Sequence, residues 1–243
     1  MSGRIGSTPR RGTATRRHGA AWAIAAVGAV LAGGSGCSTA STPPAARKAV
    51  SVALGPTDPE SAITVDGGRV SVRSPVGWSR SPRSDDYLVR YTPGQQKTFP
   101  AVVVTSADAP NGLTDVTTDN HGEFVAAVAE NLAANFSRDG RSTLLKKPTA
   151  VKLGDRLGVA WTAPGTAKVG GLKQPIERSC VAVIVAGRMV TVEARAPKGK
   201  LDDEGLAAAR GVAAAIAPPA PADAPAEEPP AADDTAAGEQ PTE

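Results

Sequence analysis

Residues 180–186 read Cys180-Val181-Ala182-Val183-Ile184-Val185-Ala186, an unbroken apolar run of strand length. Such a run without polar alternation predicts a central β-strand that is buried on both faces. Gly187 follows as a tight hairpin turn, and residues 189–196 then alternate between apolar and polar. The buried face of this last strand would carry Val190, Val192 and Ala194, and the wetter face Thr191, Glu193 and Arg195.

Apolar segments before this pair predict six further strands, and two helices complete the domain. Residues 63–65 and 69–73 alternate around Asp66-Gly67-Gly68, which is typical of a hairpin. The predicted order is ββββ-α-ββββ-α, an α+β fold in which helices cover an antiparallel sheet. We expect strands at 63–65, 69–73, 87–91, 99–106, 144–153, 156–162, 176–186 and 189–196, and helices from 120 and over about 203–217.

Both helices have recognisable starts. The first is expected to begin at Asn120, whose side chain would cap free backbone amides while Glu123 reaches back in a capping box. Its apolar residues recur at helical spacing, so this stripe should pack on the sheet as core. The stripe comprises Phe124, Val125, Val128, Leu132 and Phe136. The second helix would be capped by Asp202 and stopped by Pro218 and Pro219.

Residues 72–78 read Val-Arg-Ser-Pro-Val-Gly-Trp, an early strand that runs into a Pro-x-Gly-Trp turn. With the two helices in matching places, this segment resembles the Mog1/PsbP-like family, which includes actinobacterial lipoproteins of the LpqN type. The resemblance covers most of residues 63–217. It implies a non-enzymatic binding or accessory role, with some lipoproteins of the group handling lipid or glycolipid envelope components. It also implies that Trp78 is a packing residue, and Trp161 is interpreted in the same way.

The N-terminus resembles a bacterial lipoprotein signal. Five arginines precede a weakly apolar run over residues 20–31 that is too short to span a membrane comfortably. Ser35 and Gly36 stand directly before Cys37, which the resemblance makes the site of diacylglyceryl and palmitoyl lipidation, although Gly34 departs from the usual Leu. An ordinary secretory signal with an incidental cysteine is the alternative, and Arg16-Arg17 leaves twin-arginine export open. The arginines are Arg4, Arg10, Arg11, Arg16 and Arg17.

Composition divides the chain into four parts. Residues 1–36 form the predicted signal peptide, and residues 37–62 are rich in Ser, Thr, Pro and Ala, which predicts a lipidated flexible stalk. Residues 63–217 carry every aromatic residue except Trp22 and predict one globular domain. Residues 218–243 contain Pro, Ala and acidic residues without branched aliphatic or aromatic side chains, so a disordered acidic tail is expected.

The charge of the predicted mature chain is unevenly distributed. Residues 37–217 hold 22 basic and 17 acidic residues, a net charge of +5, whereas residues 218–243 hold seven acidic residues and no basic one. The basic residues are scattered and no aromatic platform lies between them, so a nucleic-acid partner is not expected.

No pattern in the chain predicts catalysis, a cofactor or a metal site. His121 is the only histidine after residue 36 and is expected to be exposed in the first helical turn. Cys180 lacks a cysteine partner in the mature chain and is interpreted as a buried strand residue. Asp85-Asp86 and Asp202-Asp203 fit a turn and a helix start, rather than the opposed carboxylates of a glycosidase. Gly170-Gly171 is interpreted as a turn between strands.

These observations predict an exported protein, lipid-anchored at Cys37 to the outer face of the bacterial cell membrane or to the periplasmic face of an envelope membrane. Its domain is expected to dock an envelope protein. Two alternatives stay open, a carrier of a lipid or small molecule and a hydrolase that uses only carboxylates. A carrier would need an apolar cavity, whereas most of the few aromatic residues are needed to fill the core.

Overall fold

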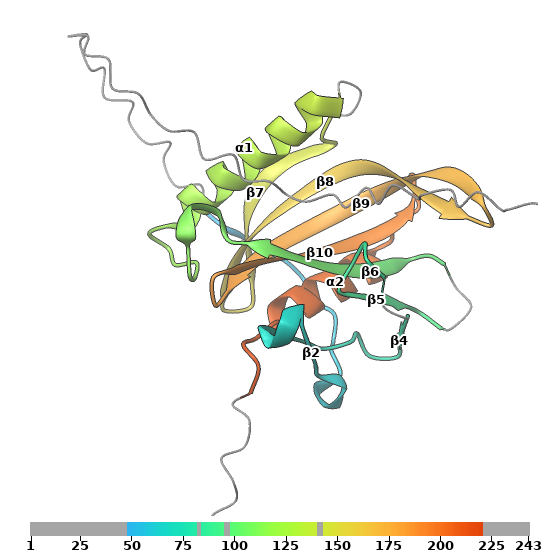
Figure 1. Cartoon of the computed structure of the whole chain (residues 1–243), viewed down its shortest axis with the longest axis horizontal. Helices are drawn as coiled ribbons and strands as arrows, with labels where there is room; N and C mark the ends of the chain where they lie inside the picture. Colours follow the sequence, from blue (N-terminus) through green and yellow to red (C-terminus); the bar gives the residue numbers. More distant parts are fainter. Residues whose placement is uncertain (1–47, 82–83, 95–97, 140–142, 221–243) are drawn as a thin grey trace, which may run out of the picture. The chain divides into compact units, whose positions relative to one another are not determined.

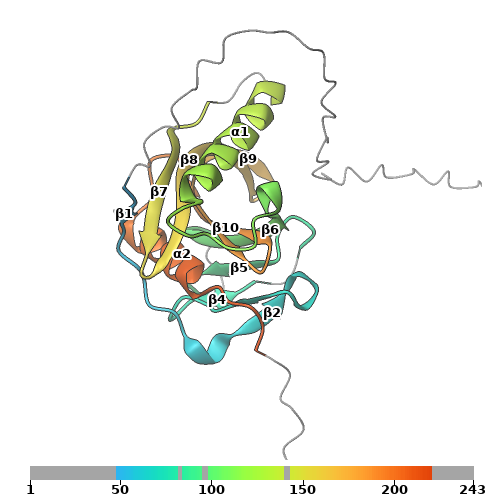
Figure 2. The same ribbon diagram turned by 90° about the vertical axis from the view of Figure 1, so that its left-hand side faces the viewer.

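The structure, a computed structural model, describes residues 48–81, 84–94, 98–139 and 143–220. The predicted signal peptide, the lipidation site Cys37, the first part of the stalk and the acidic tail from residue 221 lie outside the described residues. Figures 1 and 2 show the described ranges in two views related by a quarter turn.

Strands dominate the described chain, and they form a large sheet and a small one. The strands are β1 (Val50–Ser51), β2 (Ile63–Val65), β3 (Val70–Val72), β4 (Ser79–Arg80), β5 (Val89–Thr92), β6 (Ala101–Asp108), β7 (Lys146–Leu153), β8 (Arg156–Val169), β9 (Leu172–Val185) and β10 (Arg188–Pro197). The helices are α1 (His121–Asp139) and α2 (Asp203–Ala215), with 3₁₀ turns η1 (Pro59–Ser61), η2 (Asp66–Gly68) and η3 (Pro110–Gly112).

The central strand is where the apolar run predicted it. The large sheet has the order β1-β7-β8-β9-β10-β6-β5-β4, and every residue of β9 from Cys180 to Val185 is buried. β9 and β10 pair antiparallel across a two-residue turn at Ala186 and Gly187, which places Val185 opposite Arg188. The prediction of a buried strand joined to its neighbour by a tight hairpin is confirmed.

The fold is α+β as expected, but the predicted strand order is incomplete. Among the described residues six strands precede α1, because the two-residue strands β1 and β4 add to the four expected. The hairpin β2–β3 forms as predicted but as a separate two-stranded sheet. β1 runs parallel to β7, so the large sheet is mixed at that edge and not wholly antiparallel. Strands of two residues carry too little periodicity to be found in a sequence.

Residues 50–57 belong with the folded domain, although they were expected in the stalk. β1 pairs with β7, and Val52 packs against the core. Gly55 donates its backbone N–H to the carbonyl of Ala207 in α2 at 2.7 Å. The chain at Gly55 passes so close to α2 that the helix also needs a glycine there. A Cβ on Gly211 would lie 2.0 Å from the Gly55 carbonyl oxygen. The domain therefore begins before the predicted boundary at residue 63.

The two helices cover opposite faces of the large sheet (Figure 1). On one face α2 and β3 pack with Val181, Val183 and Val185. On the other face Phe124 and Val128 of α1 pack with Trp161, Cys180, Ala182 and Ile184. Residues alternate along β9 between these two clusters, as the two-residue period of a strand requires. The apolar stripe predicted for the first helix is thus core.

Helix capping was predicted correctly for one helix and wrongly for the other. The Asp202 carboxylate accepts the backbone N–H of Gly205 at 2.8 Å and caps α2, which ends at Ala215. The Asn120 side chain instead accepts the backbone N–H of Thr117, which precedes the helix. Glu123 accepts a hydrogen bond from Asn111 of η3, so the capping box does not form. Both side chains bond to residues outside the helix, and the local sequence does not show which partner such a side chain will choose.

The hairpin of β8 and β9 is longer than predicted. Its strands were expected to end at Thr162 and to resume at Ile176, yet they stay paired out to Val169 and Leu172 around the Gly170-Gly171 turn. β7 reaches β8 only as far as Thr162, and β10 reaches β9 only as far as Ile176. The outer part of the hairpin therefore extends past its neighbours as a two-stranded ribbon (Figure 1).

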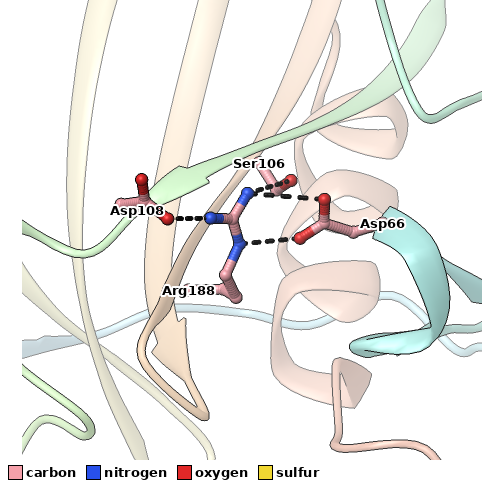
Figure 3. A network of polar contacts seen from close by, with 4 residues as sticks. All are labelled: Asp66, Ser106, Asp108 and Arg188. Carbon is pink, nitrogen blue, oxygen red and sulfur yellow. Dashed lines mark hydrogen bonds and ion pairs between the residues drawn. The ribbon is translucent and has the colours of Figure 1, made fainter.

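Arg188 ties the small sheet to the large one (Figure 3). Its guanidinium donates from Nε to Oδ2 of Asp66 at 2.7 Å, from Nη2 to Ser106 at 3.3 Å and from Nη1 to Asp108. Asp66 and Arg188 are both mostly buried, whereas the Asp108 side chain is exposed. A fork of donors that meets a carboxylate in this way fixes geometry as well as charge, so we interpret this network as structural.

Candidate functional site

Within the described residues, half of the face on which α1 lies has no helical cover. α1 packs over β7 and β8 (Figure 2), while β10, β6 and β5 continue the sheet beyond it. Directly paired residues on neighbouring strands share a face. Glu193 pairs with Cys180, a member of the α1 cluster, and therefore faces the same side as α1. The same reasoning places Arg178, Arg195 and Arg90 on this uncovered half.

An ion-pair cluster occupies this half of the sheet. Glu193 is only 8% exposed, and its Oε2 lies 2.7 Å from Nε of Arg195. Its Oε1 lies 3.8 Å from Nη1 of Arg178. Arg178 and Arg195 are direct cross-strand partners, an arrangement in which like charges repel. Glu193 is their shared counter-ion, and we call these three residues the arginine cluster.

The position of Arg178 depends on a glycine in the neighbouring strand. Its Nη2 donates to the carbonyl of Pro164 at 3.1 Å, so the side chain reaches toward β8. A Cβ on Gly165 would lie 3.0 Å from Nε and 3.2 Å from Cδ of Arg178. Glycine at this position leaves the space that the guanidinium stem occupies.

The charge of this region is not balanced. Arg90 lies on the same face, paired with Val103, and donates from Nη2 to the carbonyl of Thr98 at 2.6 Å. Three arginines thus share the uncovered half of the sheet with the carboxylate of Glu193. The buried Nε atoms of Arg90 and Arg178 have no hydrogen-bond partner among the described residues. Planar guanidinium groups are suited to bind carboxylates or phosphates, and the side chains of Arg178 and Arg195 are partly exposed.

Cys180 pairs with Glu193 on the same face of the sheet, but its thiol is not reactive. It is buried, as predicted, and burial raises the pKa of its thiol well above the ordinary value, with Glu193 adding to this effect and Arg178 and Arg195 opposing it. The thiolate is the nucleophilic form of cysteine. A buried and protonated thiol is therefore a packing residue.

The expectation that His121 is exposed is wrong. Its side chain is 7% exposed, and Nε2 lies 2.8 Å from the carbonyl oxygen of Gly158 in β8. This contact fastens the start of α1 to the sheet. It was missed because it joins residues 37 positions apart, whereas the sequence shows only that a histidine stands in the first helical turn.

The remaining candidates keep the roles that the sequence predicted. Asp85 and Asp86 are exposed in the turn between β4 and β5, and Asp202 caps α2. Trp78 packs against the α2-side core, and Trp161 is buried in the α1-side core. Within the described ranges no group of three or more His, Cys, Asp or Glu side chains is placed to hold a metal ion. No helix among these residues has the length and apolarity needed to cross a bilayer.

The arginine cluster itself was not predicted, although a signal for it existed. The two-residue turn at Ala186 and Gly187 pairs residues that are equally distant from its midpoint, so Arg178 falls opposite Arg195 and Cys180 opposite Glu193. Continuing that register along the hairpin would have shown two arginines side by side with one glutamate on the same face.

Comparison with known proteins finds similarity of structure only. No family model matches the chain, and no curated protein sequence does. Among solved structures, a Bacteroides thetaiotaomicron protein is 10% identical, with a TM-score of 0.38, and the match covers 64% of this chain and 47% of that one. The chain thus spans about half the length of that structure.

Two further structures are smaller proteins. LpqN of Mycobacterium tuberculosis, described as involved in cell envelope biogenesis, is 12% identical, with a TM-score of 0.35, and the match covers 66% of this chain and 90% of LpqN. PsbP of the cyanobacterium Synechocystis is 14% identical, with a TM-score of 0.38 and coverage of 64% and 89%. The neighbours thus include an LpqN and a PsbP protein, the proteins named in the resemblance of the Pro-x-Gly-Trp segment. At these scores, function has to be argued from the site.

Proposed function

We propose that this protein is a non-enzymatic accessory module of the bacterial cell envelope, lipid-anchored through Cys37, that docks an acidic partner protein. The arginine cluster carries this proposal, because it places two partly exposed arginines with a single carboxylate on a half of the sheet without helical cover. Arginine is favoured at protein interfaces, where its planar donors meet carboxylates in pairs.

Packing on both faces of the sheet favours docking over a carrier role. The space between α1 and the sheet is filled by Phe124, Val128, Trp161 and Ile184, all of them buried. On the opposite face Tyr91 and Ile216 are almost fully buried beneath α2 and its neighbours. A lipid carrier needs a large apolar cavity between such layers, whereas these side chains occupy the layers.

The cluster also argues against a carboxylate-dependent hydrolase. A general acid–base pair needs two carboxylates that face each other across a cleft. Glu193 is the carboxylate of this cluster, and each of its oxygens faces an arginine. Such a group balances charge, and its Oε2 already accepts a hydrogen bond from Arg195.

The anchor rests on the sequence before residue 48. A basic segment, a short apolar run and Ser35-Gly36-Cys37 support export and acylation. One acyl chain binds a membrane only marginally, so two or more on Cys37 are needed for a stable anchor. The proposed location is the outer face of the cell membrane.

Site-specific crosslinking tests the docking face. A photoreactive residue replaces Thr105, which lies on the same face as Glu193, and the tethered full-length protein is irradiated in its native envelope. We expect one crosslinked product, which is lost in Arg178→Gln/Arg195→Gln and kept in Lys168→Gln/Lys173→Gln, a pair of exposed ribbon lysines with the same charge change. Equal crosslinking in both variants would contradict docking through the arginine cluster.

A native mass spectrum before and after organic extraction provides the second arm of this test. A bare protein mass supports docking. A discrete extra mass that disappears on extraction would instead identify a carrier of a lipid or small molecule.

A further inference from the structure

We propose that one corner of the domain, where the chain enters the sheet, rests on anionic lipid headgroups and orients the protein on its membrane. This lysine corner consists of Lys48, Val50, Leu145, Lys146 and Lys147. The inference builds on the lipid anchor of the proposed function, and it concerns a surface different from the arginine cluster.

Strand register brings the members of the corner together. β1 runs parallel to β7, with Val50 opposite Val151 and Ser51 opposite Lys152. Following this register toward the N-terminus places Lys48 beside Thr149, close to the start of β7. Lys146 and Lys147 begin β7, and all three lysines are exposed. Figure 2 shows β1 alongside β7 at the edge of the large sheet.

Apolar side chains are exposed among these lysines. Val50 is 63% exposed and Leu145 is 49% exposed. The backbone of Leu145 is held by a hydrogen bond from its N–H to the carbonyl of Thr162 at 2.9 Å, so the residue belongs to the ordered sheet edge. Large apolar side chains flanked by lysines are typical of surfaces that lie at the boundary between lipid headgroups and acyl chains.

The tether makes this corner the part of the domain held next to the membrane. Residues 38–47 are the only residues between the proposed anchor Cys37 and Lys48. A fully extended chain of this length spans at most about 40 Å. A flexible stalk over residues 37–62, as predicted, would allow a greater distance between the domain and the membrane. Residues 50–57 are instead bound to the sheet and to α2, which shortens the tether. The short tether therefore keeps the lysine corner at high local concentration beside the lipid surface.

The positive charge of the lysine corner indicates that its lipid partner is anionic. Anionic headgroups attract each nearby lysine, and the attraction amounts to roughly a fivefold gain in binding per lysine near the surface. Three lysines at one corner would thus favour the contact by about a hundredfold over a neutral surface. Salt screens this attraction, so the contact should weaken as ionic strength rises.

A fluorescence measurement on the full mature chain, acylated at Cys37, tests the orientation. An environment-sensitive fluorophore is attached at Leu145→Cys and, as the matched control, at Leu172→Cys on the tip of the ribbon, where the native leucine is 71% exposed. The buried thiol of Cys180 does not compete for the label. On phosphatidylglycerol vesicles we expect a blue shift at position 145 and none at position 172.

Three comparisons decide the outcome. The shift at position 145 should disappear at high salt, on phosphatidylcholine vesicles, and in Lys48→Glu/Lys146→Glu/Lys147→Glu. Equal signals at the two positions, or a shift at position 145 that persists on neutral lipid, would overturn the proposal. The salt and lipid comparisons use the native lysines, so they decide the matter even if the triple variant folds poorly.

The mass of the purified protein separates this inference from the proposed function. An acylated Cys37 with equal fluorescence at both positions overturns the orientation and leaves the anchor intact. An unmodified Cys37 overturns the anchor together with the orientation. Loss of crosslinking at the arginine cluster affects neither result, because that cluster lies on β9 and β10.

Discussion

The two halves of the α1 face meet along β9 but carry different chemistry. Under α1, β9 presents Ala182 and Cys180, and β8 presents Trp161. Two residues farther along β9, in the same alternation, stands Arg178, which pairs with Arg195 and faces Glu193. The change from apolar to charged coincides with the end of the helical cover. Along β9, this face is therefore apolar beneath α1 and charged beyond it.

The largest loss of stability should come from removing a core side chain beneath α1. Phe124→Ala removes a side chain that is 0% exposed between α1 and the sheet. We expect a loss of about 3–5 kcal/mol in the free energy of unfolding, because the ring leaves a cavity that the packed layers cannot close. Urea denaturation measures it, with Leu132→Ala on the partly buried end of the stripe as control. A smaller loss for Phe124→Ala than for the control would contradict this packing.

Alkaline pH should lower the stability of the domain through one buried group on each face of the sheet. Burial raises the pKa of Cys180 on the α1 face above its ordinary value of 9.0. Burial also raises the pKa of Tyr91, on the opposite face, from 10.0 to about 12, and the nearby Arg80 opposes this shift. Between the unfolded and folded pKa values the native state holds a proton that the unfolded chain has released. Stability is therefore intact below about pH 9 and falls as pH rises above it.

Each group can lower the free energy of unfolding by at most about 1.4 kcal/mol per pH unit. Tyr91→Phe should remove the part of the decline that lies between pH 10 and about pH 12, while the part due to Cys180 persists. The measurement is urea denaturation at a series of pH values. The same decline in Tyr91→Phe and in the native protein would contradict the assignment.

The smallest effect should come from the uncovered half. Glu193→Gln leaves Arg178 and Arg195 facing each other without a counter-ion. Because both arginines are partly exposed, solvent screens their repulsion, and we expect a loss of only about 1 kcal/mol. High salt should reduce the difference from the native protein. A variant as stable as the native protein at low salt would show that Glu193 does not balance this charge.

Local patterns in the sequence predicted much of the architecture. The apolar run at residues 180–186 predicted the central strand, and the spacing of Phe124 and Val128 predicted the buried stripe of α1. Asp202 predicted the start of α2. Each of these features depends on residues within a few positions of one another. Prediction from the sequence failed for two-residue strands and for a contact with a loop, as at β1, β4 and Asn120.

The site was predicted less well than the fold, because it is assembled from distant residues. Cys180 was predicted as buried, but Glu193 was assigned to the wetter face of its strand and is in fact nearly buried. It forms ion pairs with two arginines, one in the same strand and one in the next. Alternation tells which face a residue occupies, but the partners on that face decide whether a charge there is covered.

Most of the strands, both helices and their apolar faces follow from the amino-acid sequence alone, because burial imposes periods of two and of about 3.6 residues on the chain. The contacts between distant segments depend on the tertiary fold. It brought Gly55 against α2, His121 against Gly158, and Arg188 against Asp66. Such contacts depend on backbone register and on the close approach of distant segments, which leave no periodic trace in the chain.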